Sequence, residues 1–238
     1  MNDDGNRDGP VAGSLFAYLD QELRDFLVHN GISRSFTTGE VLLRYGDPTD
    51  HVLLLVHGWV RVSVSARDGQ EILCGLRGPG DVLGDLAAMH GWPRTATVSA
   101  LEDVRVVQLT STRFVASLHE RPGIAVAMVK QMAARLREAE AARVDFATLG
   151  VDQRVAAYLR RLADQHGIPG RDGVVIRMPV TQQDIANRVG ASRRAVARSM
   201  ALLRERRIVC TARRRIVLRQ PDVLAAFARC EPEGTQRE

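Results

Sequence analysis

Residues 179–207 read PVTQQDIANRVGASRRAVARSMALLRERR, and this stretch decides the fold of the C-terminal part of the chain. Thr181 is followed three positions later by Asp184, a pairing typical of a helix N-terminus, and Gly190 predicts the end of that helix. Ser192 is suited to cap a second helix. Two short helices joined by a glycine-containing turn form a helix-turn-helix, whose second helix reads DNA in the major groove.

The second helix has an apolar stripe, Val196, Met200 and Leu203, and a cationic face. The planar guanidinium of an arginine can donate to O6 and N7 of guanine at the same time. Such a pair of hydrogen bonds contributes roughly 1–3 kcal/mol of discrimination against the other bases. We expect three side chains to read bases: Arg193, Arg194 and Arg198. The alternative is a solvated basic face on an ordinary helical hairpin.

Two β-branched runs follow, residues 208–210 and 216–218, and they flank the basic segment 211–215. This pattern predicts a β-hairpin wing whose tip meets the DNA backbone. The side chains expected to contact phosphates are Thr181, Gln183, Ser192, Arg213, Arg214 and Arg215.

Charge is unevenly distributed along the chain. Residues 153–220 hold sixteen arginines and four acids, a formal charge of +12 in a chain whose total is +5, which leaves −7 for the rest. This segregation predicts a C-terminal domain that binds nucleic acid with marked salt dependence. No apolar run approaches the roughly 18 residues of a membrane span, and the polar start does not resemble a signal peptide, so we expect a cytoplasmic protein without membrane contact.

From Ser35 to Thr110 the chain consists of short β-branched runs separated by glycines. The runs 51–56, 60–65, 71–76 and 104–109 predict an antiparallel β-roll or jelly-roll barrel with room for a small ligand. Residues 1–13 are polar and predict a disordered tail, and residues 14–29 have the apolar spacing of one or two small helices. The fold class is therefore α+β.

Two segments of the roll have the composition of an anion site. Gly84-Asp85-Leu86 provides a glycine bend with a carboxylate, and Arg94-Thr95 provides a guanidinium beside a hydroxyl. Together they are suited to a phosphate and a sugar hydroxyl. An ion pair between the arginine and the aspartate that merely closes a loop would have the same sequence pattern.

Residues 122–149 predict one long helix and a hinge, since Pro122 suits a first turn and Gly150 follows the last. Its apolar spacing resembles a coiled-coil seam and predicts a homodimer, unless the stripe packs only on its own barrel. The seam residues are Met128, Met132, Leu136, Ala139, Arg143 and Phe146. Asp152 is expected to cap a helix over 153–165. The domains are then a tail (1–13), a β-roll (14–121), the helix and hinge (122–149), a winged helix-turn-helix (150–222) and an extension (223–238), the last ten residues of which we expect to be disordered.

With its predicted domains in this order, the chain resembles the CRP/FNR family of bacterial transcription regulators. The resemblance covers roughly residues 15–220 and rests on Gly46-Asp47-Pro48, Gly58-Trp59-Val60-Arg61-Val62, Gly80-Asp81-Val82-Leu83-Gly84-Asp85-Leu86, Arg94-Thr95-Ala96, Gln131-Met132-Ala133-Ala134-Arg135-Leu136, residues 180–186 and Gly190-Ala191-Ser192-Arg193. It implies a homodimer that binds a pseudo-palindromic operator in double-stranded DNA, contacts or blocks RNA polymerase, and takes a small effector, cAMP or another cyclic nucleotide, in the roll.

The chain also differs from the family pattern at several positions. Asp85 replaces the glutamate that contacts ribose in cAMP-binding members, and Ala139 and Glu140 stand at the helix positions that contact the base. Arg194 replaces a glutamate of the reading helix, so a different operator is expected.

Other functions remain open from the sequence. His51 and His57 are too few ligands for a metal enzyme of the cupin type, and Cys74, Cys210 and Cys230 lack the spacing of a metal site, so we expect no metal and no catalytic residues. A haem or gas sensor that uses His51, His57 or Cys74 is an alternative. The main alternative is a constitutive DNA-binding regulator with a vestigial pocket.

Overall fold

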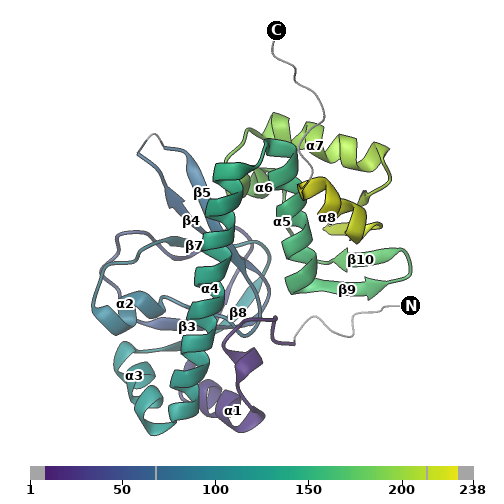
Figure 1. The fold of residues 1–238 in the computed structure, drawn as a ribbon. Coiled ribbons are helices and arrows are strands. Elements are labelled where there is room, and N and C mark those ends of the chain that lie inside the picture. Colours follow the sequence, from purple (N-terminus) through teal and green to yellow (C-terminus); the bar gives the residue numbers. More distant parts are fainter. Residues whose placement is uncertain (1–8, 68, 213, 230–238) are drawn as a thin grey trace. The chain divides into compact units, whose positions relative to one another are not determined.

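The computed structural model describes residues 9–67, 69–212 and 214–229 (Figure 1). The chain divides into two compact units, Met1–Ala139 and Glu140–Glu238, and the division falls inside one long helix. Each unit has its own strands and its own buried side chains.

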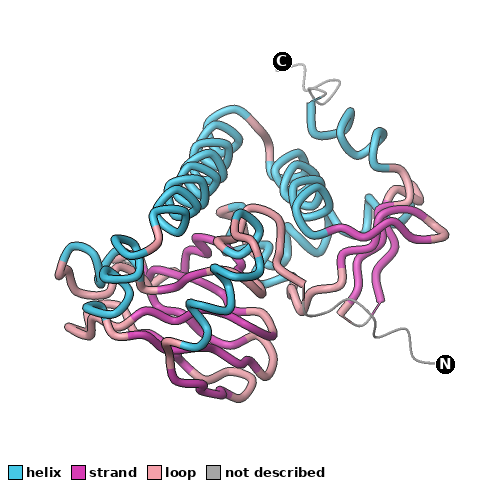
Figure 2. Tube along the Cα trace, turned by 90° about the horizontal axis from the view of Figure 1, so that it is seen from below, coloured by secondary structure: helices cyan, strands magenta, loops and turns pink. Residues whose placement is uncertain are grey.

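The first unit is built around two antiparallel sheets with a shared core. One sheet has the strand order β1-β8-β3-β6 and the other β2-β7-β4-β5. Leu53 and Val106 of the first sheet pack with Leu43, Val60 and Val98 of the second, which confirms the predicted antiparallel β domain (Figure 2). The strands are β1 (Ile32–Phe36), β2 (Val41–Leu43), β3 (Val52–His57), β4 (Val60–Ser65), β5 (Glu71–Arg77), β6 (Val82–Leu83), β7 (Thr97–Ala100) and β8 (Val104–Leu109).

A second core lies between the first sheet and the helices of this unit. Leu54 and Val107 of the sheet pack with Phe114 and Ile124 of the helices, and all four are nearly or fully buried. The elements are η1 (Phe16–Tyr18), α1 (Gln21–His29), α2 (Asp85–His90), α3 (Ser111–Glu120) and the start of α4 (Pro122–Thr148). The small helices expected over residues 14–29 are therefore present.

The N-terminal segment differs from its prediction. Residues 1–8 lie outside the described part of the chain, but residues 9–13 are attached to the domain. The Val11 amide donates to Pro79 O at 2.8 Å, and the Phe16 amide donates to Gly80 O at 3.1 Å. Backbone bonding to a buried loop outweighs the polar composition of this short segment, so the predicted tail is wrong for residues 9–13.

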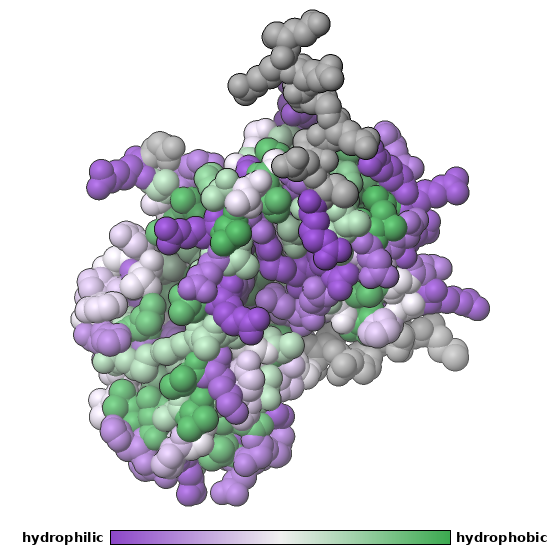
Figure 3. Space-filling view, in the orientation of Figure 1, coloured by the Kyte–Doolittle hydropathy of each residue, from purple (hydrophilic) through white to green (hydrophobic). Residues whose placement is uncertain are grey.

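Helix α4 has two apolar faces. Ile124, Ala127 and Met128 are buried in the core of the first unit, and Met132 packs against it. Met128 and Met132 therefore contribute to the core of their own unit, and their part in a dimer seam stays a prediction. A different stripe is exposed, Val126, Val129, Ala133 and Leu136 at spacings of three, four and three, and hydrophobic side chains are visible along α4 in Figure 3.

The second unit contains the C-terminal end of α4, further helices and one small sheet. The sheet has the order β11-β12-β10-β9, with antiparallel neighbours. Val155, Leu159 and Ile176 are buried with the apolar stripes of the last helices. The elements are α5 (Val151–His166), β9 (Gly167–Gly170), β10 (Gly173–Ile176), α6 (Gln182–Val189), α7 (Arg193–Glu205), β11 (Val209–Ala212), β12 (Arg215–Leu218) and α8 (Pro221–Arg229).

Helices α6 and α7 begin and end where the sequence indicates. Thr181 Oγ1 accepts from the Asp184 amide at 3.1 Å, while the Asp184 carboxylate accepts from the Thr181 amide at 2.9 Å. Gly190 ends α6 with a left-handed φ of 61°, and Ser192 caps α7 by accepting from the Ala195 amide at 3.2 Å. The helix-turn-helix and its wing are confirmed.

Two boundaries near the ends of this unit differ from prediction. Helix α5 begins at Val151 after Gly150, and Asp152 accepts a hydrogen bond from the Ser199 hydroxyl of α7 instead of capping α5. Helix α8 contacts α5 and buries Leu224, so the unit continues beyond residue 222, while residues 230–238 lie outside the described part. Among the described residues, no helix has both the length and the apolarity needed to cross a membrane.

Candidate functional site

The face of α7 that is predicted to read bases is exposed. Arg193, Arg194 and Arg198 are all solvent-exposed, whereas Val196 and Met200 on the opposite face are buried. The arginines are exposed because they lie on the side of the helix opposite the apolar stripe, and the stripe is the side that packs against the domain. The structure thus brings the three predicted base-reading side chains together at the N-terminal half of one helix.

The predicted phosphate contacts lie at the helix starts and on the wing. Thr181, Gln183 and Ser192 are exposed, although the Thr181 hydroxyl donates to Asp184 at 2.6 Å and the Gln183 amide donates to Asn187 at 2.7 Å. On the hairpin of β11 and β12, Arg214 and Arg215 are exposed and Arg214 has a left-handed φ of 55°. Arg213 lies outside the described residues.

Within the second unit, the end of α4 packs on the turn between α6 and α7. A Cβ atom on Gly190 would lie 2.6 Å from Cε2 of Phe146, so the ring fills the space that the glycine leaves. Arg154 stacks over the Phe146 ring at 5.0 Å and donates to Val189 O at 2.8 Å and Leu149 O at 2.8 Å. Phe146, predicted as a seam residue, therefore also supports the helix-turn-helix.

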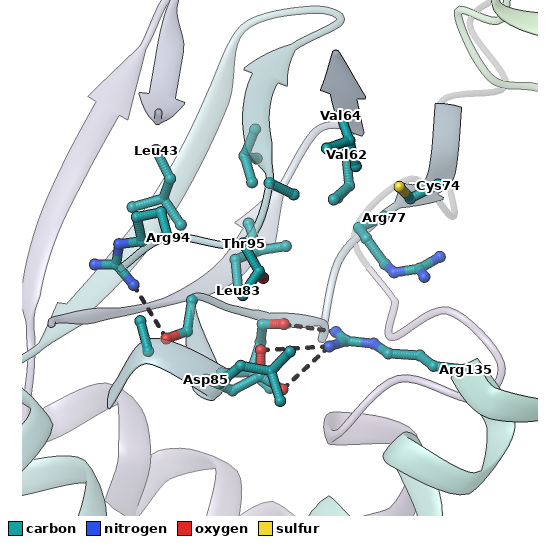
Figure 4. Close-up of a pocket in the computed structure, with 16 residues that line it drawn as sticks. Leu43, Val62, Val64, Cys74, Arg77, Leu83, Asp85, Arg94, Thr95 and Arg135 are labelled. Atoms are coloured by element: carbon teal, nitrogen blue, oxygen red, sulfur yellow. Dashed lines mark hydrogen bonds and ion pairs between the residues drawn. The ribbon is translucent and has the colours of Figure 1, made fainter. Parts of the chain in front are cut away.

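The first unit contains a cavity of about 250 Å³ (Figure 4). Gly84, Asp85, Leu86, Arg94 and Thr95 all line it, so the structure brings the two predicted segments to one site. Ala139 is exposed and does not line the cavity, and Glu140 belongs to the second unit. The remaining lining residues are Leu43, Val62, Val64, Cys74, Arg77, Val82, Leu83, Ala87, Ala96, Val98 and Arg135.

Arg94 is a buried cation without a carboxylate partner in the described structure. It is 3% exposed and donates to Thr49 Oγ1 at 2.9 Å, to Gly84 O at 3.0 Å and to His51 O at 2.7 Å, which are all neutral acceptors. Burial lowers the pKa of its guanidinium, against the opposing effect of the carboxylates of Asp50, Asp47 and Asp85. The alternative of an ion pair between Arg94 and Asp85 is therefore not the arrangement found.

Asp85 pairs with Arg135 of α4 instead. Arg135 Nη1 lies 3.2 Å from Asp85 Oδ2, and its Nη2 donates to Val82 O at 2.6 Å and to Asp81 at 3.3 Å. Gln131, fully buried one turn earlier, donates to Asp81 at 2.8 Å. The floor of the cavity is thus bonded to α4 through two carboxylates.

Arg77 is a lining residue that the sequence analysis missed. Its Nη1 donates to Leu76 O at 2.7 Å and to Glu138 of α4 at 3.2 Å. Burial opposes the charged form, but the nearby carboxylates of Glu138, Asp81 and Asp85 prevail and raise the pKa of Arg77. The run expected to form a strand ended at Leu76, whereas β5 continues through Arg77, so the arginine fell outside the predicted strand.

Other candidate ligands are dispersed. Cys74 lines the cavity, but the contact of His51 with Arg94 is made by its backbone carbonyl. Across the residues that the structure describes, no group of three His, Cys, Asp or Glu side chains forms a metal site.

Two family models match the chain in the order of its units. Residues 33–121 match the cyclic nucleotide-binding domain, and residues 153–227 match the Crp-like helix-turn-helix domain.

Curated relatives and solved structures are similar to most of the length of the chain. The chain is 28% identical over 194 residues to the CRP-like cAMP-activated global transcriptional regulator of Mycobacterium tuberculosis, covering 82% of this chain and 87% of that one. It is 29% identical over 192 residues to the global nitrogen regulator of Synechococcus elongatus, covering 80% and 86%. The structure of FixK2 from Bradyrhizobium japonicum has a TM-score of 0.73 at 22% identity, covering 83% and 96%, and supports the fold alone. The chain therefore belongs to the CRP/FNR family, as a DNA-binding transcription regulator with an effector-binding domain of the cyclic nucleotide-binding type.

Proposed function

We propose that this regulator acts as a homodimer, that it binds a pseudo-palindromic operator, and that a cyclic nucleotide in the cavity of the first unit controls it. RNA polymerase is the expected downstream partner. The observation that carries the effector part is Arg94, whose buried positive charge has only neutral acceptors.

A cation buried among neutral groups is costly, and an anionic ligand relieves the cost. Thr95 lies beside Arg94 in the cavity wall and offers a hydroxyl, and Gly84 supplies a bend with a left-handed φ of 76°. A phosphate monoanion suits this end of the cavity. The relative from Mycobacterium tuberculosis is named as cAMP-activated, which supports the same class of ligand here.

A constitutive regulator is the second candidate, and one observation favours it. Asp85, the carboxylate expected to accept from a sugar hydroxyl, is already paired with Arg135, and Arg94 bonds three protein groups. An effector must compete with these contacts. If it cannot, the protein binds DNA without a small molecule.

Calorimetric titration with cAMP and with cGMP separates the two candidates. We expect saturable binding, weakened about 10-fold or more in Arg94→Ala, because a hydrogen bond to a charged group contributes roughly 1.5–3 kcal/mol. Arg105→Ala, an exposed arginine of β8 outside the lining, is the control. Since Arg94 also holds two backbone carbonyls, Thr95→Val tests the site with less risk to the fold. The absence of heat at millimolar concentrations of both nucleotides would favour the constitutive regulator.

Base reading by Arg193, Arg194 and Arg198 is also proposed, with phosphate contacts from the helix starts and the wing. Arg194 is the sharpest test, because an arginine donates to guanine whereas a glutamate accepts from N4 of cytosine. Arg194→Glu should therefore change the preferred base at one position of each half-site. In vitro selection from a random DNA pool measures this change. Arg171→Glu, on the turn between β9 and β10, should leave the selected sequence as it is, and an unchanged preference in Arg194→Glu would reject the assignment.

A further inference from the structure

The cavity has chemically different ends. Figure 4 draws Arg94 on one side and Arg77 with Cys74 on the other, with Val62 and Val64 on the wall between them. A ligand held at Arg94 therefore extends across two valines towards a second guanidinium. This second end decides which ligand fits.

Charge indicates which end takes the anion. Arg135 is neutralised by Asp81 and Asp85, and Arg77 is paired with Glu138, while Arg94 has no carboxylate among its bonded partners. The phosphate therefore belongs at Arg94. At about 250 Å³ the cavity lies near the lower limit of small-ligand sites, roughly 300–1,000 Å³, which suits a mononucleotide rather than a dinucleotide.

The Arg77 guanidinium is held in place by hydrogen bonds that use only some of its N–H donors. Both of its bonds use Nη1, and its Nη2 has no acceptor among the described residues. Gly75 makes the position possible, because a Cβ atom there would lie 2.6 Å from Nη1 of Arg77. A side chain already held by Glu138 loses little freedom when it binds a ligand.

We propose that Arg77 is a specificity residue and that the cavity prefers cGMP to cAMP. The proposal rests on the proposed function, namely a cyclic nucleotide with its phosphate at Arg94. The valines pack against the face of the base, and Arg77 meets its edge. Guanine presents two acceptors there, O6 and N7, whereas adenine presents N7 and the N6 donor, and a guanidinium has no acceptor for a donor.

The test is calorimetry with cGMP, cAMP and cyclic inosine monophosphate, which has O6 and N7 but lacks the amino group of guanine. We expect cGMP and the inosine nucleotide to bind with similar affinity, and both about 10-fold or more tightly than cAMP. In Arg77→Leu the preference should fall to within about 3-fold of unity. Arg105→Leu should keep it.

Each other outcome counts against the proposal. It is overturned if cAMP binds as tightly as cGMP, if Arg77→Leu keeps the preference, or if the inosine nucleotide binds as weakly as cAMP. Failure of all three nucleotides to bind would reject the proposed cyclic-nucleotide function as well. Because Arg77→Leu leaves Glu138 without this partner, Arg77→Leu/Glu138→Gln is titrated too, and thermal melts establish that both variants are folded.

Discussion

Gly190 and Phe146 depend on each other. The glycine has a φ of 61°, a conformation that costs other residues roughly 1–2 kcal/mol, and the ring occupies the space of the absent side chain. A methyl group at this position therefore meets two separate obstacles, one in the backbone and one in the neighbouring ring.

We expect Gly190→Ala to lower the free energy of unfolding of the second unit by about 2 kcal/mol or more, since backbone strain and ring displacement add. In a Phe146→Ala background the cost should fall to the backbone part alone, about 1–2 kcal/mol. Denaturant unfolding of the four proteins of this cycle measures the difference. Equal costs in both backgrounds would show that the ring does not restrict residue 190.

Single residues also show how much of the candidate site could be predicted from the sequence. Arg94, Thr95 and Asp85 were expected at one site because they stand in two short motifs, and they do line one cavity. The partner of Asp85 was not predictable, because Arg135 is 50 residues away and no local rule connects them. Arg77 was missed because the predicted strand ended at Leu76, one residue before it.

Among the elements, those with local signals were predicted best. Helices α6 and α7 have caps and a terminating glycine, and α4 begins with a proline, so each was found near its observed bounds. The orientation of α4 was not predictable, because it has one apolar stripe inside its own domain and another outside, and periodicity alone does not distinguish them. Helix α8 was taken for part of an extension, although Leu224 is fully buried.

We expect the proposed dimer to form at the exposed stripe of α4. In Val129→Glu/Leu136→Glu two carboxylates would enter an apolar seam, at a cost of several kcal/mol. Sedimentation velocity at micromolar concentration should show a dimer for the unaltered protein and a monomer for this variant. Ile32→Glu changes an equally exposed side chain of β1 and should remain dimeric. A dimer that survives the double substitution would place the interface elsewhere.

At the scale of the whole molecule, the sequence predicted the order of the parts. The uneven charge, the glycine-separated strands and the capped helices gave an effector-type domain before a DNA-binding one, as the two family models confirm. The fine structure of the cavity required coordinates, because its ion pairs join strands and α4 over long separations in the chain.

A dimer formed through the exposed valines and leucine of α4 would also make the regulator sensitive to its own abundance. If only the paired form binds the operator, then below the dissociation constant the amount of paired protein rises with the square of the total. A twofold change in synthesis would then change promoter occupancy about fourfold at low occupancy. Gene dosage would thus act as a second input beside the small molecule.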